Sequence, residues 1–171
     1  IALARMLALN RYKVKVYYVK FTEKTSIDWE KNRYRLITET DVPFQSLTAV
    51  DQFPVISSED LIFDAIFGSG LTRGVEGLPS EIIKMINQVD SKIISIDIPS
   101  GLFGEDNSNN SFESVVKADY TLSFQFPKLS YMFGENSLYV GEWVVLPIGL
   151  NNNVIRNTIT PYTLIENSDV A

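Results

Sequence analysis

The sequence predicts a three-layer α/β/α domain built around a mostly parallel sheet. Helical patterns alternate with apolar strand patterns in the first part of the chain, and strand patterns follow one another later. Two stretches, Leu61–Leu71 and Lys92–Leu102, share one plan, because each is an apolar strand that ends in an aspartate and a glycine turn. Open α/β sheets form ligand crevices where the carboxyl ends of such strands meet. We therefore expect the functional site at these two strand ends.

The composition is that of one globular domain that has neither cysteine nor histidine. The chain has 171 residues, of which 45% are hydrophobic and 21% are charged, and its formal net charge is −6. Without Cys and His there are no disulfides, no thiolate or imidazole metal sites and no Ser–His catalysis, so acid–base work falls to Asp, Glu, Lys or Tyr. The negative charge argues mildly against nucleic acid as a partner. No apolar run reaches the roughly 20 residues of a membrane span, so we expect no membrane partner. The lack of Cys and of a visible signal sequence leads us to expect a cytoplasmic protein.

The chain opens inside a helical pattern, with neither Met nor an N-cap residue before it. A helix followed by a turn and a strand is only half of a βαβ unit, so we expect the preceding strand to be missing and the domain to be N-terminally incomplete. The elements expected in this part are a helix at Ile1–Asn10, a strand at Lys13–Val19, a helix at Ile27–Glu39 capped by Thr25 or Ser26, and a short strand within Phe44–Val50.

The remaining elements continue the alternation and then give way to strands alone. We expect a polar loop at Gly104–Ser111, an irregular aromatic segment at Pro127–Glu135, and one domain over residues 1–150 followed by a polar tail or linker at 151–171. The expected regular elements are strands at Leu61–Phe67, Lys92–Ile98, Ala118–Phe126 and Glu142–Ile148, and a helix at Pro79–Gln88.

Two aspartates are the candidate chemical groups. Asp64 lies inside an apolar run, where burying a carboxylate is costly without a cation or several hydrogen-bond donors. The structural alternative is that Asp64 caps the neighbouring glycine loop. Asp97 faces the same choice, with Pro99 restricting the turn after it. Two such acids on successive strands favour a shared metal or substrate site over two separate caps.

The turns after the two strands supply further candidate groups. The glycines of the loop Gly68–Gly74 let a ligand approach the backbone, although the pattern is not the dinucleotide fingerprint and is equally typical of a tight turn. Ser100 offers a hydroxyl suited to a hard cation, or ordinary turn chemistry. Arg73 and Lys128 are each within reach of a ligand in principle, but a solvated side chain is the more common role for both.

Four motifs together resemble the NAD(P)H-hydrate epimerase family, the YjeF N-terminal type of domain. The motifs are D-A-I-F-G-S-G-L-T-R-G at Asp64–Gly74, I-D-I-P-S-G-L at Ile96–Leu102, K-A-D-Y-T-L-S-F-Q-F-P-K at Lys117–Lys128 and Y-V-G-E-W-V-V-L-P-I-G-L at Tyr139–Leu150. The resemblance spans nearly the whole chain in the family's order. It implies a Rossmann-like fold, a bound potassium ion, and epimerisation of the R and S forms of NADHX and NADPHX, the hydrated forms of the reduced nicotinamide cofactors.

The resemblance also assigns roles to residues. Asp64 and Ser100 match potassium-ligand positions, and Asp97 matches a substrate-binding acid. A further family loop, G-N-N-G-G-D-G, has no counterpart before the helix that opens this chain, so part of the expected substrate and potassium site is lacking. The substrate-binding loop matches Gly68, Ser69, Gly70, Leu71, Thr72, Arg73 and Gly74.

Our mechanistic hypothesis makes Asp97 the first catalytic candidate and Asp64 the second, more closely tied to potassium. Protonation of the departing hydroxyl lets the ring nitrogen expel it, a carboxylate stabilises the resulting cation, and water returns to either face.

Three other interpretations stay open. One is a non-catalytic scaffold, although a scaffold has no need for Asp64, Asp97 and Ser100. Another is a different Rossmann-like enzyme such as a methyltransferase, which requires an early glycine-rich loop. The third is one half of a bifunctional protein fused to an ATP- or ADP-dependent dehydratase. Relatives commonly dimerise, so a homodimer is a further expectation of the resemblance.

Overall fold

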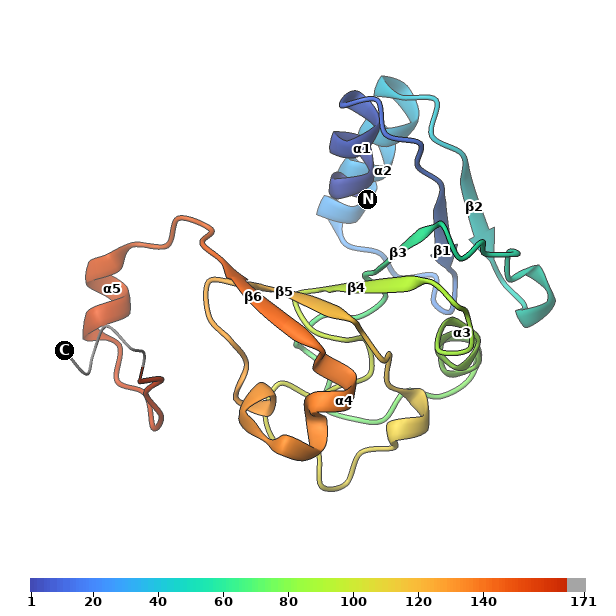
Figure 1. The fold of residues 1–171 in the computed structure, drawn as a ribbon. Helices are drawn as coiled ribbons and strands as arrows, with labels where there is room; N and C mark the ends of the chain where they lie inside the picture. Colours follow the sequence, from blue (N-terminus) through green and yellow to red (C-terminus); the bar gives the residue numbers. More distant parts are fainter. Residues whose placement is uncertain (166–171) are drawn as a thin grey trace.

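The computed structural model describes residues 1–165 and shows an α/β fold with parallel strands, as the sequence predicts (Figure 1). The sheet is not one continuous unit, however. It consists of a two-stranded piece, β1–β2, and a four-stranded piece with the order β3–β4–β5–β6. Every pairing is parallel. The strands are β1 (Val16–Val19), β2 (Phe44–Leu47), β3 (Leu61–Asp64), β4 (Lys92–Ile96), β5 (Tyr120–Phe124) and β6 (Glu142–Leu146).

Helices lie on both sides of the strands. Figure 1 shows α3 (Leu78–Ile86) and α4 (Ser137–Val140) on one side of β4 and β6, and α1 (Ala2–Leu9) and α2 (Ile27–Glu39) on the other. The expected Ser26 cap is present, since its hydroxyl accepts the Trp29 N–H. Four short 3₁₀ helices complete the order: η1 (Val50–Gln52), η2 (Phe112–Ser114), η3 (Leu129–Met132) and η4 (Gly134–Asn136).

Four strands, β3 to β6, end earlier than predicted, and each early end has a local cause. After Asp64 the Ile66 N–H donates to the Asp64 carboxylate, so the ladder stops there. At the ends of β4 and β5, Asp97 and Gln125 adopt positive φ angles of 72° and 62°, which are incompatible with a strand. Pro147 follows β6 and has no N–H to continue pairing.

Helix α3 joins the two sheet pieces through a common core. Ile82 and Ile83 are 1% and 0% exposed, and they belong to one buried cluster with residues of both pieces. Burying such an aliphatic side chain contributes about 1.5–3 kcal/mol. The shared cluster therefore holds the pieces together although no strand pairing connects them; its other members include Val19 of β1, Leu47 of β2 and Ile93 of β4.

The sheet face that points away from α3 is apolar and largely open. The register places Phe63 beside Ile94 and Ile94 beside Tyr120, opposite in direction to Ile93, which packs in the core with α3. Helices α1 and α2 leave much of this face uncovered. The exposed apolar side chains on it are Leu61, Phe63, Tyr120, Phe124, Val144 and Leu146.

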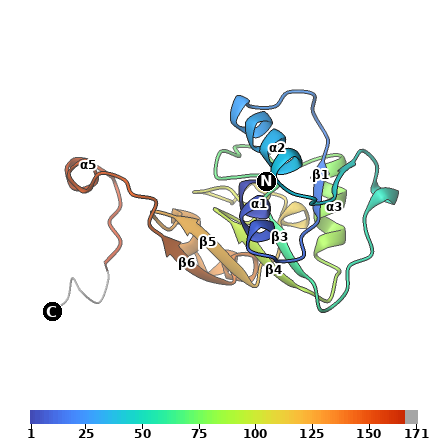
Figure 2. The same ribbon diagram turned by 90° about the horizontal axis from the view of Figure 1, so that it is seen from above.

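The tail is not wholly irregular, which corrects the expectation of a polar loop from residue 151. A short helix, α5 (Asn152–Asn157), forms because the Asn151 side chain accepts the Asn153 N–H at 2.9 Å and caps it. Figures 1 and 2 both show α5 apart from the rest of the fold. The last part of the predicted tail, residues 166–171, lies outside the described residues. Within residues 1–165, every helix is too short or too polar to reach across a lipid bilayer.

Candidate functional site

The predicted acids lie at one edge of the sheet because β3 and β4 are parallel. Asp64 is the last residue of β3, and its register partner in β4 is Ser95. Asp97 comes directly after β4, and Ser100 lies in the turn that follows. The structure therefore brings together the strand ends that the sequence singled out.

Asp64 is buried among donors, with only 2% of the residue exposed. Its Oδ2 accepts from the Ser95 hydroxyl at 2.8 Å and the Ser100 N–H at 2.8 Å, and its Oδ1 accepts from the Ser100 hydroxyl at 2.6 Å and the Ile66 N–H at 3.3 Å. Burial raises the pKa of Asp64, and these hydrogen bonds offset part of that rise. No basic side chain of the described residues pairs with Asp64, so its charge is balanced by dipoles alone.

Asp97 has a different environment, because it is paired with a cation. The Lys128 ammonium lies 2.8 Å from Asp97 Oδ1, and the two side chains are 18% and 20% exposed. The Ser69 N–H donates to Asp97 Oδ2 at 3.3 Å. Burial pushes the pKa of Asp97 up, but the hydrogen bond and charge of Lys128, together with hydrogen bonds from Ser69, outweigh it, and the pKa lies below its usual value. Asp97 is therefore ionised at neutral pH.

The two acids and Ser100 accept hydrogen bonds from N–H groups in one short stretch, Ile66–Ser69, which leads from β3 into the glycine loop. The Ile66 N–H donates to Asp64, the Phe67 N–H donates to the Ser100 hydroxyl at 2.8 Å, and the Ser69 N–H donates to Asp97. The capping roles weighed as structural alternatives are thus present in the geometry. These capping hydrogen bonds neither exclude nor establish a metal or substrate role, because the same carboxylate and hydroxyl oxygens can also contact a ligand. The metal and substrate roles therefore stay predictions.

The glycines of this loop are not required by backbone conformation. Gly68, Gly70 and Gly74 all lack positive φ angles. A Cβ at Gly68 would lie 3.5 Å from Asp97 Oδ2, whereas Gly70 and Gly74 face open space. The substrate-binding role of this exposed loop therefore stays a prediction. Arg73 is also exposed and forms no ion pair within residues 1–165, so the structure does not bring it to the acids.

Sequence reasoning misjudged or missed three residues of the site. Lys128 was expected to be a solvated surface lysine, but it is largely buried against Asp97. Ser95 and Tyr131 were not singled out, although Tyr131 donates its hydroxyl to the Asp97 carbonyl at 2.6 Å. The signal for Ser95 is a polar residue within the apolar run I-I-S-I of β4. No local signal identifies Lys128 or Tyr131, since both reach Asp97 from beyond the next strand.

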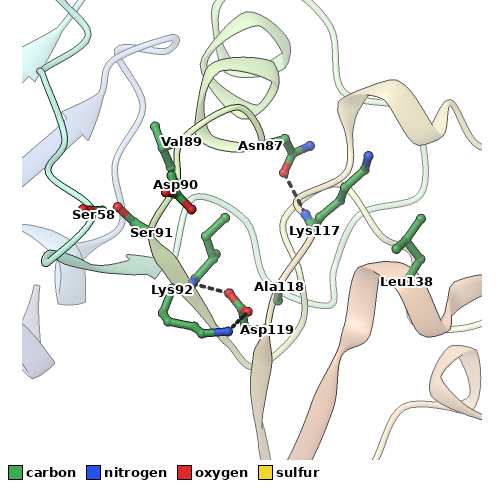
Figure 3. Close-up of a pocket in the computed structure, with 11 residues that line it drawn as sticks. Ser58, Asn87, Val89, Asp90, Ser91, Lys92, Lys117, Ala118, Asp119 and Leu138 are labelled. Atoms are coloured by element: carbon green, nitrogen blue, oxygen red, sulfur yellow. Dashed lines mark hydrogen bonds and ion pairs between the residues drawn. The ribbon is translucent and has the colours of Figure 1, made fainter.

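A hollow with a volume of about 640 Å³ lies elsewhere, at the amino ends of β4 and β5 (Figure 3). Its polar groups largely pair with one another: Lys92 contacts Asp119 at 2.6 Å, and the Asn87 side chain accepts the Lys117 N–H at 2.8 Å. Because the strands are parallel, this hollow and the two acids lie at opposite edges of the sheet. It adds nothing to the chemistry of Asp64 and Asp97.

Comparison with known proteins identifies the family. The family described as YjeF-related protein N-terminus matches residues 1–130. The chain belongs to this family. NAD(P)H-hydrate epimerase of Oenococcus oeni is 33% identical over 88% of this chain and 68% of its own length, and the enzyme of the same name from Anaerococcus prevotii is 34% identical over 91% and 71%.

Members of the YjeF family also occur in longer proteins. The bifunctional NAD(P)H-hydrate repair enzyme Nnr of Thermofilum pendens is 38% identical over 53% of this chain, which corresponds to 17% of the enzyme. The fold agrees with a solved structure, the crystal structure of yeast ynu0, with a TM-score of 0.62 at 20% identity over 98% of this chain and 68% of that one. The Rossmann-like architecture expected from the resemblance is thereby confirmed.

Proposed function

We propose that this chain is an isomerase that interconverts the R and S forms of hydrated NADH and NADPH, a step in nicotinamide-cofactor repair. The observation that carries the proposal is the pair of acids from the ends of neighbouring strands, which hold the backbone that leads into the exposed glycine loop. The epimerases that share a third of the sequence support it. Relatives with this name also make the non-catalytic scaffold the less favoured alternative.

Asp97 is the catalytic candidate because its carboxylate is ionised and partly accessible. The hydrated ring carbon bears a hydroxyl and the ring nitrogen, so the hydroxyl takes one proton from solvent and leaves as water, which gives an iminium-like cation. An anionic Asp97 would stabilise this cation, accept the proton that the incoming water loses as it adds to either face, and return that proton to solvent. General acid–base assistance of this kind contributes roughly 10²–10⁴-fold in rate. The loop Gly68–Gly74 would hold the substrate beside Asp97.

A potassium ion fits the residues around Asp64. The carboxylate is buried and has no basic partner among residues 1–165, and the nearby hydroxyl of Ser100 and carbonyl of Phe67, which lie 3.3 Å apart, are hard oxygen donors. No cluster of three acidic, histidine or cysteine side chains forms within the described part of the chain, which suits a monovalent ion better than a divalent one. Asp64 and Ser100 would hold the ion, and the ion would supply positive charge next to the glycine loop.

The fusion partner, the oligomeric state and the cellular location are further parts of this proposal. The bifunctional Nnr enzymes support fusion to a dehydratase domain as one context for the chain. The homodimer and the cytoplasmic location expected from the sequence stay predictions.

The test is an epimerisation assay on the longest form of the protein that contains this chain. Purified R-NADHX is supplied with potassium or with sodium at the same ionic strength, and conversion to the S form is followed by chromatography. We expect conversion above the spontaneous rate, faster with potassium. A folded protein that leaves the spontaneous rate unchanged contradicts the proposed activity, and equal rates in sodium and potassium contradict the potassium site alone.

A further inference from the structure

Asp97 has a backbone conformation that needs support from outside its own strand. Its φ angle of +72° is in the left-handed region, which is uncommon for residues other than glycine and costs of order 1 kcal/mol or more. Two hydrogen bonds hold the peptide units around it. The Asp97 N–H donates to the Leu122 carbonyl at 2.8 Å, and the Tyr131 hydroxyl donates to the Asp97 carbonyl at 2.6 Å. Burial raises the pKa of Tyr131, so its hydroxyl stays protonated and remains a donor.

The carboxylate of Asp97 is held separately from its backbone. Lys128 Nζ lies 2.8 Å from Oδ1, and the Ser69 N–H lies 3.3 Å from Oδ2. Each oxygen therefore has a donor from a different part of the chain. Lys128 is the cation that faces Asp97, and Tyr131 is the other titratable group in contact with it.

Lys128 and Tyr131 come from one short segment, the 3₁₀ helix η3 together with its N-cap. This segment is itself anchored. The Ser130 N–H donates to the Gly104 carbonyl at 3.1 Å, and the Asn136 side chain donates to the Ser130 carbonyl at 2.8 Å. Tyr131 is 7% exposed and packs in a buried cluster with Ile98 and Leu102, so its ring cannot swing away freely. These hydrogen bonds and the burial of Tyr131 therefore fix the position of the segment.

We propose that η3 is a clamp for Asp97, in which Tyr131 holds its left-handed backbone and Lys128 holds its carboxylate. The inference rests on the proposed function, in which Asp97 faces the reacting carbon. Both residues are positioning residues: they act on the substrate only through Asp97. A carboxylate fixed in advance need not be ordered during the reaction, and small errors in its placement are costly in rate.

The first experiment removes one hydroxyl. Tyr131→Phe keeps the buried ring and deletes the donor to Asp97. Tyr139→Phe is the matched control, because Tyr139 packs against the same cluster, stacks on Phe112 at 4.9 Å, and its hydroxyl has no hydrogen bond within the described residues. We expect kcat for R-NADHX to fall at least about tenfold in Tyr131→Phe while KM changes less than about twofold. Tyr139→Phe should retain the wild-type kcat.

The second experiment does not depend on activity. Hydrogen exchange of the Asp97 amide should accelerate by about tenfold or more in Tyr131→Phe and stay unchanged in Tyr139→Phe. Carbon NMR titration of the Asp97 carboxyl should show a higher pKa in Lys128→Met, and a value close to wild type in Lys128→Arg, which keeps the charge. Lys92→Met removes a lysine from a comparable Lys–Asp pair at the far edge of the sheet and should leave Asp97 unaffected.

The outcomes separate the clamp from the enzyme. An inactive wild type whose variants show the expected exchange and titration changes contradicts the proposed function and supports the clamp. Unchanged exchange and unchanged kcat in folded Tyr131→Phe overturn the role of Tyr131. An Asp97 titration in Lys128→Met that matches wild type overturns the role of Lys128.

Discussion

Asp64 and Asp97 lie at the same sheet edge, yet their environments move their pKa values in opposite directions. Burial raises the pKa of Asp64, whereas the pairing with Lys128 gives Asp97 a lowered pKa. Two carboxylates whose pKa values are moved apart in this way can take different chemical roles. The partly exposed, ionised Asp97 suits contact with a cationic intermediate, and the buried Asp64 suits an ion or the loop backbone.

Asp97→Asn should abolish most turnover while leaving the fold intact, because the amide keeps the shape and tolerates the left-handed conformation but carries no charge. We expect kcat for R-NADHX to fall by about 10²-fold or more, measured by chromatography, with an unchanged circular dichroism spectrum. Asp106→Asn changes an acid in the polar loop and serves as the control. Wild-type turnover by Asp97→Asn would remove Asp97 from the mechanism.

The stability difference between wild type and Asp97→Asn should depend on pH in a defined direction. Because the folded-state pKa of Asp97 is lowered, its ionised form contributes stability above the unfolded-state pKa of about 3.9. That contribution is lost as pH falls through the folded-state pKa. Urea denaturation at several pH values should therefore show wild type losing its advantage on acidification. An advantage that grows at low pH would contradict the pairing with Lys128.

At the scale of elements, some helices and loops are determined by neighbouring residues, and others are determined by contacts with distant parts of the chain. Helix α2 begins where Ser26 caps it, and its bounds, Ile27–Glu39, are those expected from the sequence. Helix α3 is defined instead by what it buries, since its isoleucines join β1, β2 and β4 in one core. The stretch that leads from β3 into the glycine loop is different again, because Asp64 of β3 and two residues that follow β4 hold its N–H groups.

Ser26→Ala should lower the free energy of unfolding by about 1 kcal/mol, because the Trp29 N–H loses its acceptor at the start of α2. Thr38→Ala lies in the same helix, where the hydroxyl only bonds back to the Tyr34 carbonyl, and should change stability by less than about 0.5 kcal/mol. Chemical denaturation of both variants measures the difference. Equal losses in the two variants would argue against a specific role for the cap.

For the whole molecule, the two faces of the four-stranded sheet differ in cover. The face toward α3 and α4 is packed, although it carries the buried polar residues Ser95, Thr121 and Ser123. The other face is apolar and largely exposed in the described chain. Polarity alone would place the apolar face in the core and the face with Ser95, Thr121 and Ser123 toward solvent. Burial is therefore determined here by the side on which the helices pack.

One substitution made on both sides tests this asymmetry. Val144→Thr changes a side chain that is 49% exposed on the open face, and we expect less than about 0.5 kcal/mol of destabilisation. Val140→Thr places the same hydroxyl at a site that is 1% exposed and should cost about 1–3 kcal/mol. Thermal and chemical denaturation provide the comparison. A large loss at Val144 would show that something covers the open face in solution.

The sequence by itself determined the features that depend on neighbouring residues. The α/β class, the extent of α2, the parallel strands and the placement of Asp64, Ser100 and Asp97 at neighbouring strand ends all follow from periodicity, caps and turn residues within short stretches. Parallel strands then bring their carboxyl ends to one edge, so the location of the candidate site was predictable as well.

Only the tertiary structure decided the rest, because it depends on contacts between distant parts of the chain. The left-handed turn at Asp97 is held by Tyr131, and the ion pair at its carboxylate comes from Lys128, some thirty residues away. The division of the sheet and its open apolar face likewise depend on where α1, α2 and α3 pack. Local sequence carries no record of such contacts, since the same lysine or strand pattern is compatible with a solvated or a buried position.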